Sequence, residues 1–463
     1  MAPNINSTDG NKSNFHFENN GDEVIVGPDL NHTKSPMDKK QYRLITLPNG
    51  LKCVLICDTV AMRQRKLEGH YETDGEDESI GSNNSDAEDV DDNSEDSDDE
   101  SENNGLRKAA TALSVNVGSY HDPPYLQGLS HFLEHMLFLG TESFPGDNEY
   151  DAFLSQHGGN DNAFTDMEYT CYHYCIPQDG SDGEKNVWKA LEMFSSFFTC
   201  PLLGGEQAHR ELNAVESEFE LNKSDDNNRL GQLMSYTCGM DEGAAIMGRK
   251  YCEQVENDKP FHPFAKFAWG NEQSLKTEPE ANDIDVMKEL RDYYHTHYYA
   301  KNMRLVVLAG YELDEIQKRV VKYFSNVPSD PRLPSPTYDK DSERGCISNL
   351  HPYKLPFHSS SLNKIYRVVP VNDRHTLTIT WQIPSLCPHW RTKPADYIAH
   401  LLGHEACGSI LSSLKHRGWA MGCSAGTGED GESDASTHAL FMLRISLSKA
   451  GMCYWKHVVQ IGS

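Results

Sequence analysis

The sequence has no long apolar run, no secretory leader and no dense cysteine framework. Its apolar stretches fall well short of the roughly eighteen residues that a transmembrane helix needs, so we expect no membrane span. The N-terminus, MAPNINSTDGNKSN, lacks the apolar segment of a secretory signal. The 12 cysteines are scattered along the chain, which favours reduced thiols in the cytoplasm. Non-classical export and a nuclear presence are secondary alternatives.

Basic residues are also scarce, since 42 Lys and Arg stand against 70 Asp and Glu. Residues 71–102 alone hold sixteen acidic side chains and no Lys or Arg, and removing them takes the formal charge from −28 to −12. Such a composition cannot bury enough apolar surface to fold, so we predict a disordered acidic insertion at 71–104. It is either a solvated spacer or a docking strip for basic proteins and peptides. With no basic stripe elsewhere, nucleic acid is not an expected partner.

The remaining pattern mixes strands and helices without strict alternation, which predicts an α+β fold. We expect a flexible N-terminal lead at 1–38 and a first domain at 39–325, with the acidic insertion between strands of one sheet. A segment rich in Pro and charge makes 326–360 the expected linker. Residues 361–463 repeat the strand–helix–strand character of the first domain and form a second, partial one.

Periodicity places the individual elements. The predicted strands are 42–47, 51–57, 110–117, 161–164, 169–176, 303–308, 377–383 and 439–447. The predicted helices are 128–139, 148–157, 186–200, 205–222, 313–324 and 394–415, and residues 236–262 are expected to form a surface insertion.

The segment His131-Phe132-Leu133-Glu134-His135 carries the chemistry. In a helix, positions i, i+3 and i+4 share a face, so both imidazoles and the carboxylate point into the same space. Two His nitrogens with this spacing can bind one Zn²⁺, and Glu134 lies where it can take a proton from water that the metal acidifies. The alternative is a helix that merely exposes two histidines. The apolar neighbours argue against it, because buried ionisable groups need partners.

A catalytic zinc needs a third protein ligand. The predicted helix at 205–222 offers Glu211 and Glu218, which are seven residues apart and therefore share a face. Glu216 and Glu220 point elsewhere and are expected to be solvated. Spacing alone does not decide between Glu211 and Glu218.

Two segments resemble the active site of the pitrilysin–insulysin family of inverted-zincin metallopeptidases. They are residues 131–170, HFLEHMLFLGTESFPGDNEYDAFLSQHGGNDNAFTDMEYT, and residues 210–220, RELNAVESEFE. Residues 363–386 and 403–420 resemble the start of the second domain of that family. The resemblance implies a helix-covered sheet in each domain and one zinc per chain. It implies that His131, His135 and Glu218 bind the zinc, that Glu134 is the catalytic base, and that Glu211 supports catalysis by orienting a ligand histidine.

The same resemblance implies what the site acts on. Family members bind peptides as an added strand, and Asn162, Ala163 and Phe164 match the edge that receives it. For Phe164, core packing is an equal alternative to a pocket wall. The acidic insertion and the segment KIYRVVP point to a branch that cleaves at basic or dibasic sites, on the N-terminal side of Arg. The expected function is therefore a zinc metalloendopeptidase whose expected substrates are basic peptides.

Length is the main departure from the family pattern. The resemblance implies four similar domains, of which this chain holds one and part of a second. An Arg and a Tyr that the other half supplies to the substrate are absent. We therefore expect a C-terminally truncated form. The alternative function is a catalytically weak or inactive isoform that binds basic peptides or partners through its acidic tract.

Overall fold

The structure is a computed structural model. It describes residues 23–63, 107–178, 182–238, 262–330, 355–359, 361–428 and 434–462. The predicted acidic insertion at 71–104 lies outside the described residues, as do most of the predicted lead at 1–38, of the predicted linker at 326–360 and of the predicted insertion at 236–262.

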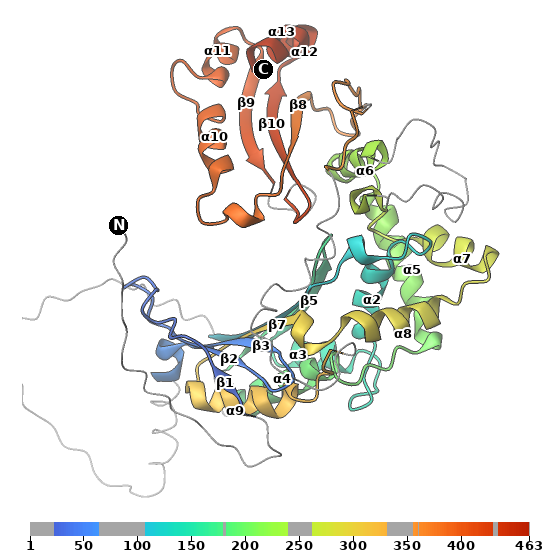
Figure 1. Ribbon diagram of the computed structural model, residues 1–463, viewed down its shortest axis with the longest axis vertical. Coiled ribbons are helices and arrows are strands. Elements are labelled where there is room, and N and C mark those ends of the chain that lie inside the picture. The colour runs from blue at the N-terminus through green and yellow to red at the C-terminus, as the bar shows by residue number, and fades with distance from the viewer. Residues whose placement is uncertain are drawn as a thin grey trace, which may run out of the picture.

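A seven-stranded sheet with the order β1-β2-β3-β7-β4-β6-β5 forms the base of the first unit (Figure 1). Neighbouring strands pair antiparallel except β3 and β7, which are parallel. This antiparallel-rich sheet, covered by helices, confirms the predicted fold class. The strands are β1 (Ile25–Val26), β2 (Gln41–Thr46), β3 (Lys52–Cys57), β4 (Lys108–Val115), β5 (Asn160–Thr165), β6 (Thr170–Pro177) and β7 (Met303–Ala309).

One face of this sheet is buried because apolar side chains alternate along its strands. In β6, Tyr172, Tyr174 and Ile176 point into the core, while His173 between them is exposed. Helices cover that face, and they carry apolar stripes at helical spacing. They are α3 (Glu149–Gln156), α4 (Gly183–Ser196) and α9 (Leu313–Phe324), with α2 (Leu129–Leu137) and α8 (Val286–His297) beside them (Figure 1).

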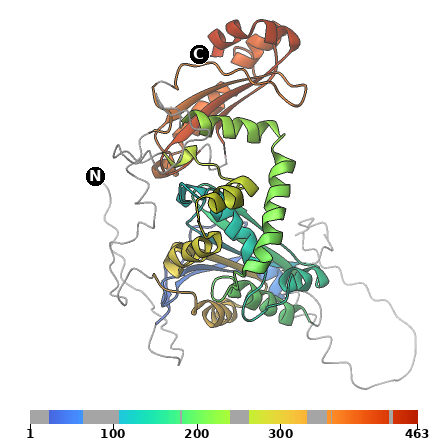
Figure 2. The same ribbon diagram turned by 90° about the vertical axis from the view of Figure 1, so that its right-hand side faces the viewer.

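A long helix, α5 (Gly205–Asn222), packs across α2 and leads through α6 (Asp226–Cys238) to the second unit (Figure 2). The bounds of α5 match the predicted helix at 205–222, whereas α6 and α8 were not predicted. Short elements complete the unit: η1 (Ser119–His121), η4 (Pro263–Ala265), the π-helical η5 (Gln273–Thr277), α7 (Glu278–Ala281) and η6 (Ala300–Asn302).

The second unit holds a three-stranded antiparallel sheet, β8-β10-β9. The single helix predicted at 394–415 is wrong, because the chain breaks between Gly403 and Ser409 and forms two helices. Strand β9 was also missed, since its Gly, Ala, Ser and Cys residues have little strand propensity. The elements are β8 (Thr376–Ile383), η8 (Cys387–His389), α10 (Pro394–Leu402), α11 (Ile410–His416), β9 (Ala420–Thr427), β10 (Ala439–Leu447), α12 (Lys449–Cys453) and α13 (Trp455–Gly462).

A small apolar cluster joins the two units. Phe264 and Met167 of the first unit pack with Leu440 and Met442 of β10. The fully buried ring of His438 meets Phe264 edge to face, with ring centroids 5.0 Å apart. The two units therefore share buried surface next to β5 and β6.

In the described part of the chain, no helix is long and apolar enough to cross a membrane. The ten described cysteines are free thiols.

The junction predicts a measurable dependence of stability on pH. Burial, followed by the nearby His438, lowers the pKa of His262 to about 3. The unfolded chain binds this proton below about pH 6.5 and the folded chain does not, so stability is lost as pH falls from about 6.5 toward 3. His262→Asn keeps an acceptor for the Phe264 N–H, which His262 Nδ1 accepts at 3.1 Å, but cannot titrate.

Between pH 6.5 and 5 the wild-type free energy of unfolding should therefore fall by up to about 2 kcal/mol more than that of the variant. Denaturant titrations of chelator-treated protein measure the free energy of unfolding of the wild type and of the variant at each pH. A control, His32→Asn at a side chain that is 85% exposed, should follow the wild type. Parallel pH curves for wild type and His262→Asn would contradict the assignment.

Candidate metal centre

Helix α2 presents His131, Glu134 and His135 from one face. Its opposite face is fixed in the core by Leu129, Leu133 and other apolar residues. Glu134 is only 7% exposed, so the three polar groups lie in a partly desolvated site. The orientation of α2 therefore follows from burial of its apolar side.

The start of α2 is held by a buried carboxylate. Asp122 accepts hydrogen bonds from the backbone N–H groups of Gly128 and Ser130, at 2.8 and 2.9 Å. Burial raises the pKa of Asp122 to about 6, and Lys266, the next largest influence, lowers it. The side chain thus satisfies amides that a helix N-terminus otherwise leaves unpaired, just before the first histidine.

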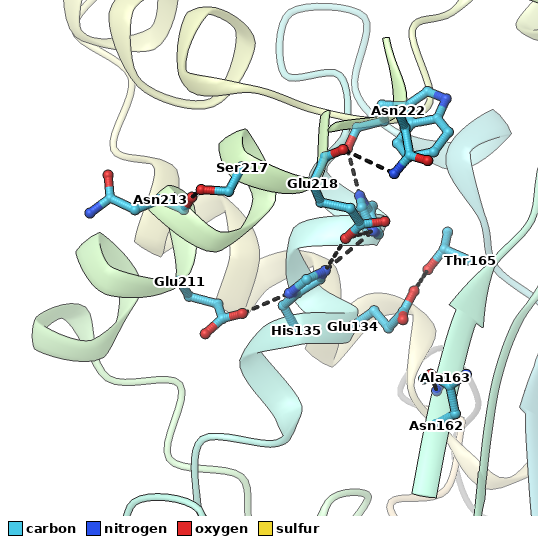
Figure 3. Close-up of polar contacts among 12 residues, drawn as sticks. Glu134, His135, Asn162, Ala163, Thr165, Glu211, Asn213, Ser217, Glu218 and Asn222 are labelled. Atoms are coloured by element: carbon cyan, nitrogen blue, oxygen red, sulfur yellow. Dashed lines mark hydrogen bonds and ion pairs between the residues drawn. The ribbon is translucent and has the colours of Figure 1, made fainter. Parts of the chain in front are cut away.

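Helix α5 brings Glu218 to the two imidazoles (Figure 3). The Nε2 atoms of His131 and His135 are 3.3 Å apart, and Glu218 Oε2 lies 3.3 Å from His135 Nε2 and 3.7 Å from His131 Nε2. A tetrahedral zinc with bonds of about 2.0–2.1 Å requires ligand atoms about 3.3–3.4 Å apart. Among the described residues this is the one group of three that could hold a metal ion, and the donor set of two nitrogens and one oxygen fits zinc.

Each histidine is oriented through its other nitrogen. His135 Nδ1 lies 2.6 Å from Glu211 Oε1, and His131 Nδ1 lies 2.5 Å from the carbonyl oxygen of Trp269. A carboxylate and a carbonyl can only accept, so each Nδ1 carries the proton and donates. In the neutral rings both Nε2 lone pairs then face the space beside Glu218, as metal ligation requires. Glu211 therefore lies behind His135 and does not reach the space between the Nε2 atoms.

Two glycines bring the Trp269 carbonyl within reach of α2. Gly128, with φ of +88°, packs so closely on Gly270 that a Cβ on Gly128 would lie 2.2 Å from the Gly270 Cα. Gly270 itself has φ of +72°. Both positions need the left-handed backbone and the absence of a side chain, so glycine is required on both sides of this contact.

The acid–base properties of the site follow from burial and from this network. Burial raises the pKa of Glu134, although the nearby His131 opposes the change. Burial opposes protonation of His135, but hydrogen bonds to Glu211 and Glu218 outweigh it and raise its pKa to about 9. The hydrogen bond from His135 lowers the pKa of Glu218. Without metal, His135 therefore carries the positive charge that the surrounding carboxylates require.

The predicted substrate residues lie on β5, the edge strand of the sheet beside α2. Ala163 faces the helices, while Asn162 and Phe164 face the other side. Phe164 is 45% exposed and meets Tyr169 edge to face, so the alternative of core packing is wrong. The structure therefore places these residues next to the metal centre, along an edge whose outer backbone groups are not paired with a described strand.

The structure adds residues that the sequence reasoning missed. Thr165, one position after the predicted substrate segment, donates a hydrogen bond to Glu134 at 2.6 Å. The Trp269 carbonyl, the Asp122 cap and the Gly128–Gly270 contact were also missed. A backbone carbonyl carries no side-chain signal, and Trp269 and Thr165 lie 138 and 31 residues from their partners in the motif.

Comparison with known proteins shows what the chain is similar to. Residues 100–248 match the family model described as Insulinase (Peptidase family M16), and residues 286–452 match the Peptidase M16 inactive domain. A nardilysin-like protein of Arabidopsis thaliana is 39% identical over 346 residues, which are 75% of this chain and 30% of that protein. Nardilysin of Homo sapiens is 36% identical over 470 residues, covering 94% of this chain and 36% of that protein.

Among solved structures, the crystal structure of pitrilysin is similar in fold, with a TM-score of 0.65 at 22% identity, covering 93% of this chain and 36% of that chain. The chain thus spans about a third of the length of these relatives.

The glycine contact predicts that Gly270→Ala weakens zinc binding. A Cβ there would meet Leu275 at 2.8 Å and strain a left-handed backbone, so the Trp269 carbonyl should move away from His131. We expect the zinc dissociation constant to rise about tenfold, as for other lost supports of ligand histidines. Competition with a fluorescent chelator measures it. Gly418→Ala, with φ of +67° but open space around it, is the control and should bind like the wild type.

The raised pKa of His135 predicts that zinc binding releases protons. At pH 7.5 the metal must displace the Nε2 proton, so affinity should weaken as pH falls below about 9. Glu211→Gln removes one carboxylate that stabilises the protonated ring, so fewer protons should be released. Calorimetry in buffers of different ionisation enthalpy counts them, with the exposed Glu206→Gln on the same helix as control. Equal proton release in wild type and Glu211→Gln would overturn this prediction.

Proposed function

The chain belongs to the insulinase family of peptidases, family M16, and on that premise we propose that its first unit is the catalytic centre of a zinc metalloendopeptidase. The observation that supports the proposal most directly is the convergence of His131, His135 and Glu218, whose nearest ligand atoms lie 3.3–3.7 Å from one another. Glu134 beside them is the remaining polar group of the motif. Because the chain spans only about a third of its relatives, activity of the chain itself is part of the proposal.

His131, His135 and Glu218 would hold the zinc, with Glu211 and the Trp269 carbonyl fixing the two rings. Bound there, zinc supplies Lewis-acid chemistry, because it acidifies water and polarises a carbonyl oxygen. Three protein ligands would leave the metal accessible to water and to the carbonyl oxygen, as in catalytic zinc sites.

Glu134 acts as the base and then as the acid. Its carboxylate takes a proton from the attacking water as the new C–O bond forms at the scissile carbonyl carbon. It then gives that proton to the amide nitrogen as the C–N bond breaks, so that a carboxylic acid and an amine leave. Burial has raised the pKa of Glu134, which suits a group that must both accept and return a proton near neutral pH.

Strand β5 would bind the peptide. An extended peptide can pair with the outer backbone groups of Asn162 to Phe164 and so lie alongside α2, with its scissile bond near Glu134. The half-exposed ring of Phe164 offers apolar surface to a substrate side chain. Backbone pairing would give affinity that depends little on sequence, and neighbouring pockets would give selectivity.

For substrates, we propose peptides with basic or dibasic sites, cut on the N-terminal side of Arg. The support is the similarity to nardilysins and the formal charge of −28, which attracts basic peptides over long range. The acidic insertion at 71–104 is the proposed docking strip for basic partners. A cytoplasmic location is consistent with the ten described free thiols.

Glu134→Gln tests the proposal. Removal of the base should lower the cleavage rate of a quenched dibasic peptide by about 10²–10⁴-fold while one zinc per chain is retained. Fluorescence measured with and without a chelator gives the rate, and metal analysis gives the zinc content. Glu142→Gln, at an exposed site, is the matched control and should cleave like the wild type.

Chelator-insensitive cleavage, or an unchanged rate in Glu134→Gln, would refute the peptidase proposal. A wild-type chain that binds one zinc and the peptide but does not cleave would favour the binding role instead.

A further inference from the structure

Thr165 lies where the edge strand meets the catalytic motif. It is the last residue of β5, and its Oγ1 lies 2.6 Å from Oε2 of Glu134 (Figure 3). Its side chain projects to the helix side of the sheet, like that of Ala163 two residues earlier. Among the described residues, this is the one hydrogen bond to the Glu134 carboxylate that the structure gives. The second oxygen of that carboxylate remains for the reaction.

The direction of this hydrogen bond is determined by the neighbouring groups. Thr170, opposite Thr165 across the β5–β6 pair, donates its proton to the carbonyl of Val117 at 2.8 Å. The two threonine hydroxyls are 3.4 Å apart, so a hydrogen bond from Thr165 to Thr170 is much weaker than the 2.6 Å hydrogen bond from Thr165 to Glu134. Thr165 has one hydroxyl proton, and a carboxylate only accepts, so the proton goes to Glu134.

The backbone that follows Thr165 is fixed by hydrogen bonds from η1. After β5 the chain turns, and the carbonyls of Asp166 and Met167 accept hydrogen bonds from Ser119 and Tyr120, at 3.1 and 2.8 Å. The approach is so close that a Cβ on Gly118 would lie 2.1 Å from the Asp166 oxygen. A hydroxyl on a well-anchored backbone can fix a carboxylate, because little freedom remains to be lost when the bond forms.

A residue of the second unit also contacts the turn that follows β5. Glu168 accepts hydrogen bonds from the backbone N–H of Ser436, at 2.8 Å, and from the Ser436 hydroxyl. Met167 packs in the apolar cluster with Leu440 and Met442 of β10. The turn that presents Thr165 is therefore fixed by contacts from both units.

We propose that Thr165 is the positioning residue for Glu134. Its hydroxyl holds Oε2, so that Oε1 is the oxygen presented to the attacking water, and it links the orientation of the base to the strand on which the peptide pairs. This inference rests on the proposed peptidase function. It assigns Thr165 no contact with the substrate and no part in binding the metal.

Two substitutions of Thr165 distinguish the effect of its hydroxyl from the effect of its side-chain shape. Thr165→Val keeps the branched shape and removes the hydroxyl, while Thr165→Ser keeps the hydroxyl and removes the methyl group. With a quenched dibasic peptide, we expect kcat of Thr165→Val to fall about tenfold or more, with KM within about twofold and one zinc per chain. Thr165→Ser should retain most of the wild-type kcat.

Thr378→Val, in the exposed strand β8 of the second unit, is the matched control and should behave like the wild type. If Thr165 had only a packing role, Val would be tolerated and Ser would not, which is the reverse order. A Thr165→Val enzyme with wild-type kcat would overturn the inference while leaving the peptidase proposal intact.

Crystal structures of the metal-free chain give a readout that needs no activity. In the wild type and in Thr165→Ser the Glu134 carboxylate should lie within hydrogen-bond distance of the hydroxyl, and in Thr165→Val it should rotate away. An unmoved Glu134 in Thr165→Val would overturn the positioning role even if the chain cleaves nothing. Loss of cleavage in every form, with Glu134 moved as expected, would count against the peptidase proposal and support the positioning role.

Discussion

The packing of α5 across α2 is the interaction on which the site depends. The motif on α2 supplies two imidazoles and a carboxylate, but a helix alone leaves them facing solvent. Because α5 packs across α2, Glu218 reaches the Nε2 atoms of both histidines. The same packing brings Glu211 to Nδ1 of His135. The crossing is stabilised by apolar residues of both helices, including Leu133 and Leu212, which lie in the main core. Hydrophobic burial therefore determines where the polar groups meet.

The charges of the candidate site favour a bound cation. Glu134, Glu211 and Glu218 surround two histidines in a partly desolvated space, where unpaired carboxylates are costly. In the metal-free chain the proton on His135 offsets part of this charge, which is why its pKa rises to about 9. A divalent metal would offset it better, because it would neutralise more charge and satisfy the lone pairs directly. Burial raises the pKa of Glu134, and the two histidines that would bind the metal oppose this rise.

The site is built almost entirely from the first unit, yet the second unit contacts it indirectly. The turn after β5 is held by η1 on one side and by Ser436 on the other, so the edge strand, its terminal threonine and the base form one connected structure. At the same junction, burial lowers the pKa of His262 to about 3. The position of the edge strand β5 is therefore a property of both units.

The sequence alone determined the local geometry of the motif and most of the sheet. Helical periodicity puts His131, Glu134 and His135 on one face, alternation of apolar residues places β3 and β6, and continuous apolar runs place β7 and β10, because these patterns depend on neighbours within one element. Local patterns failed where small residues carry little propensity, as in β9, and where one apolar stripe spans two helices, as in α10 and α11.

Only the tertiary structure gives the physical reason for the rest of the site. Glu211 and Glu218 share a face of α5, and resemblance to a family, not spacing, favoured Glu218 as the ligand. The crossing of the helices gives the physical reason, since it brings one carboxylate to the Nε2 side and the other to the Nδ1 side. The Trp269 carbonyl and Thr165 reach their partners from 138 and 31 residues away, through a backbone group and a common side chain. No pattern in the sequence marks such contacts, because they exist only once distant segments have packed.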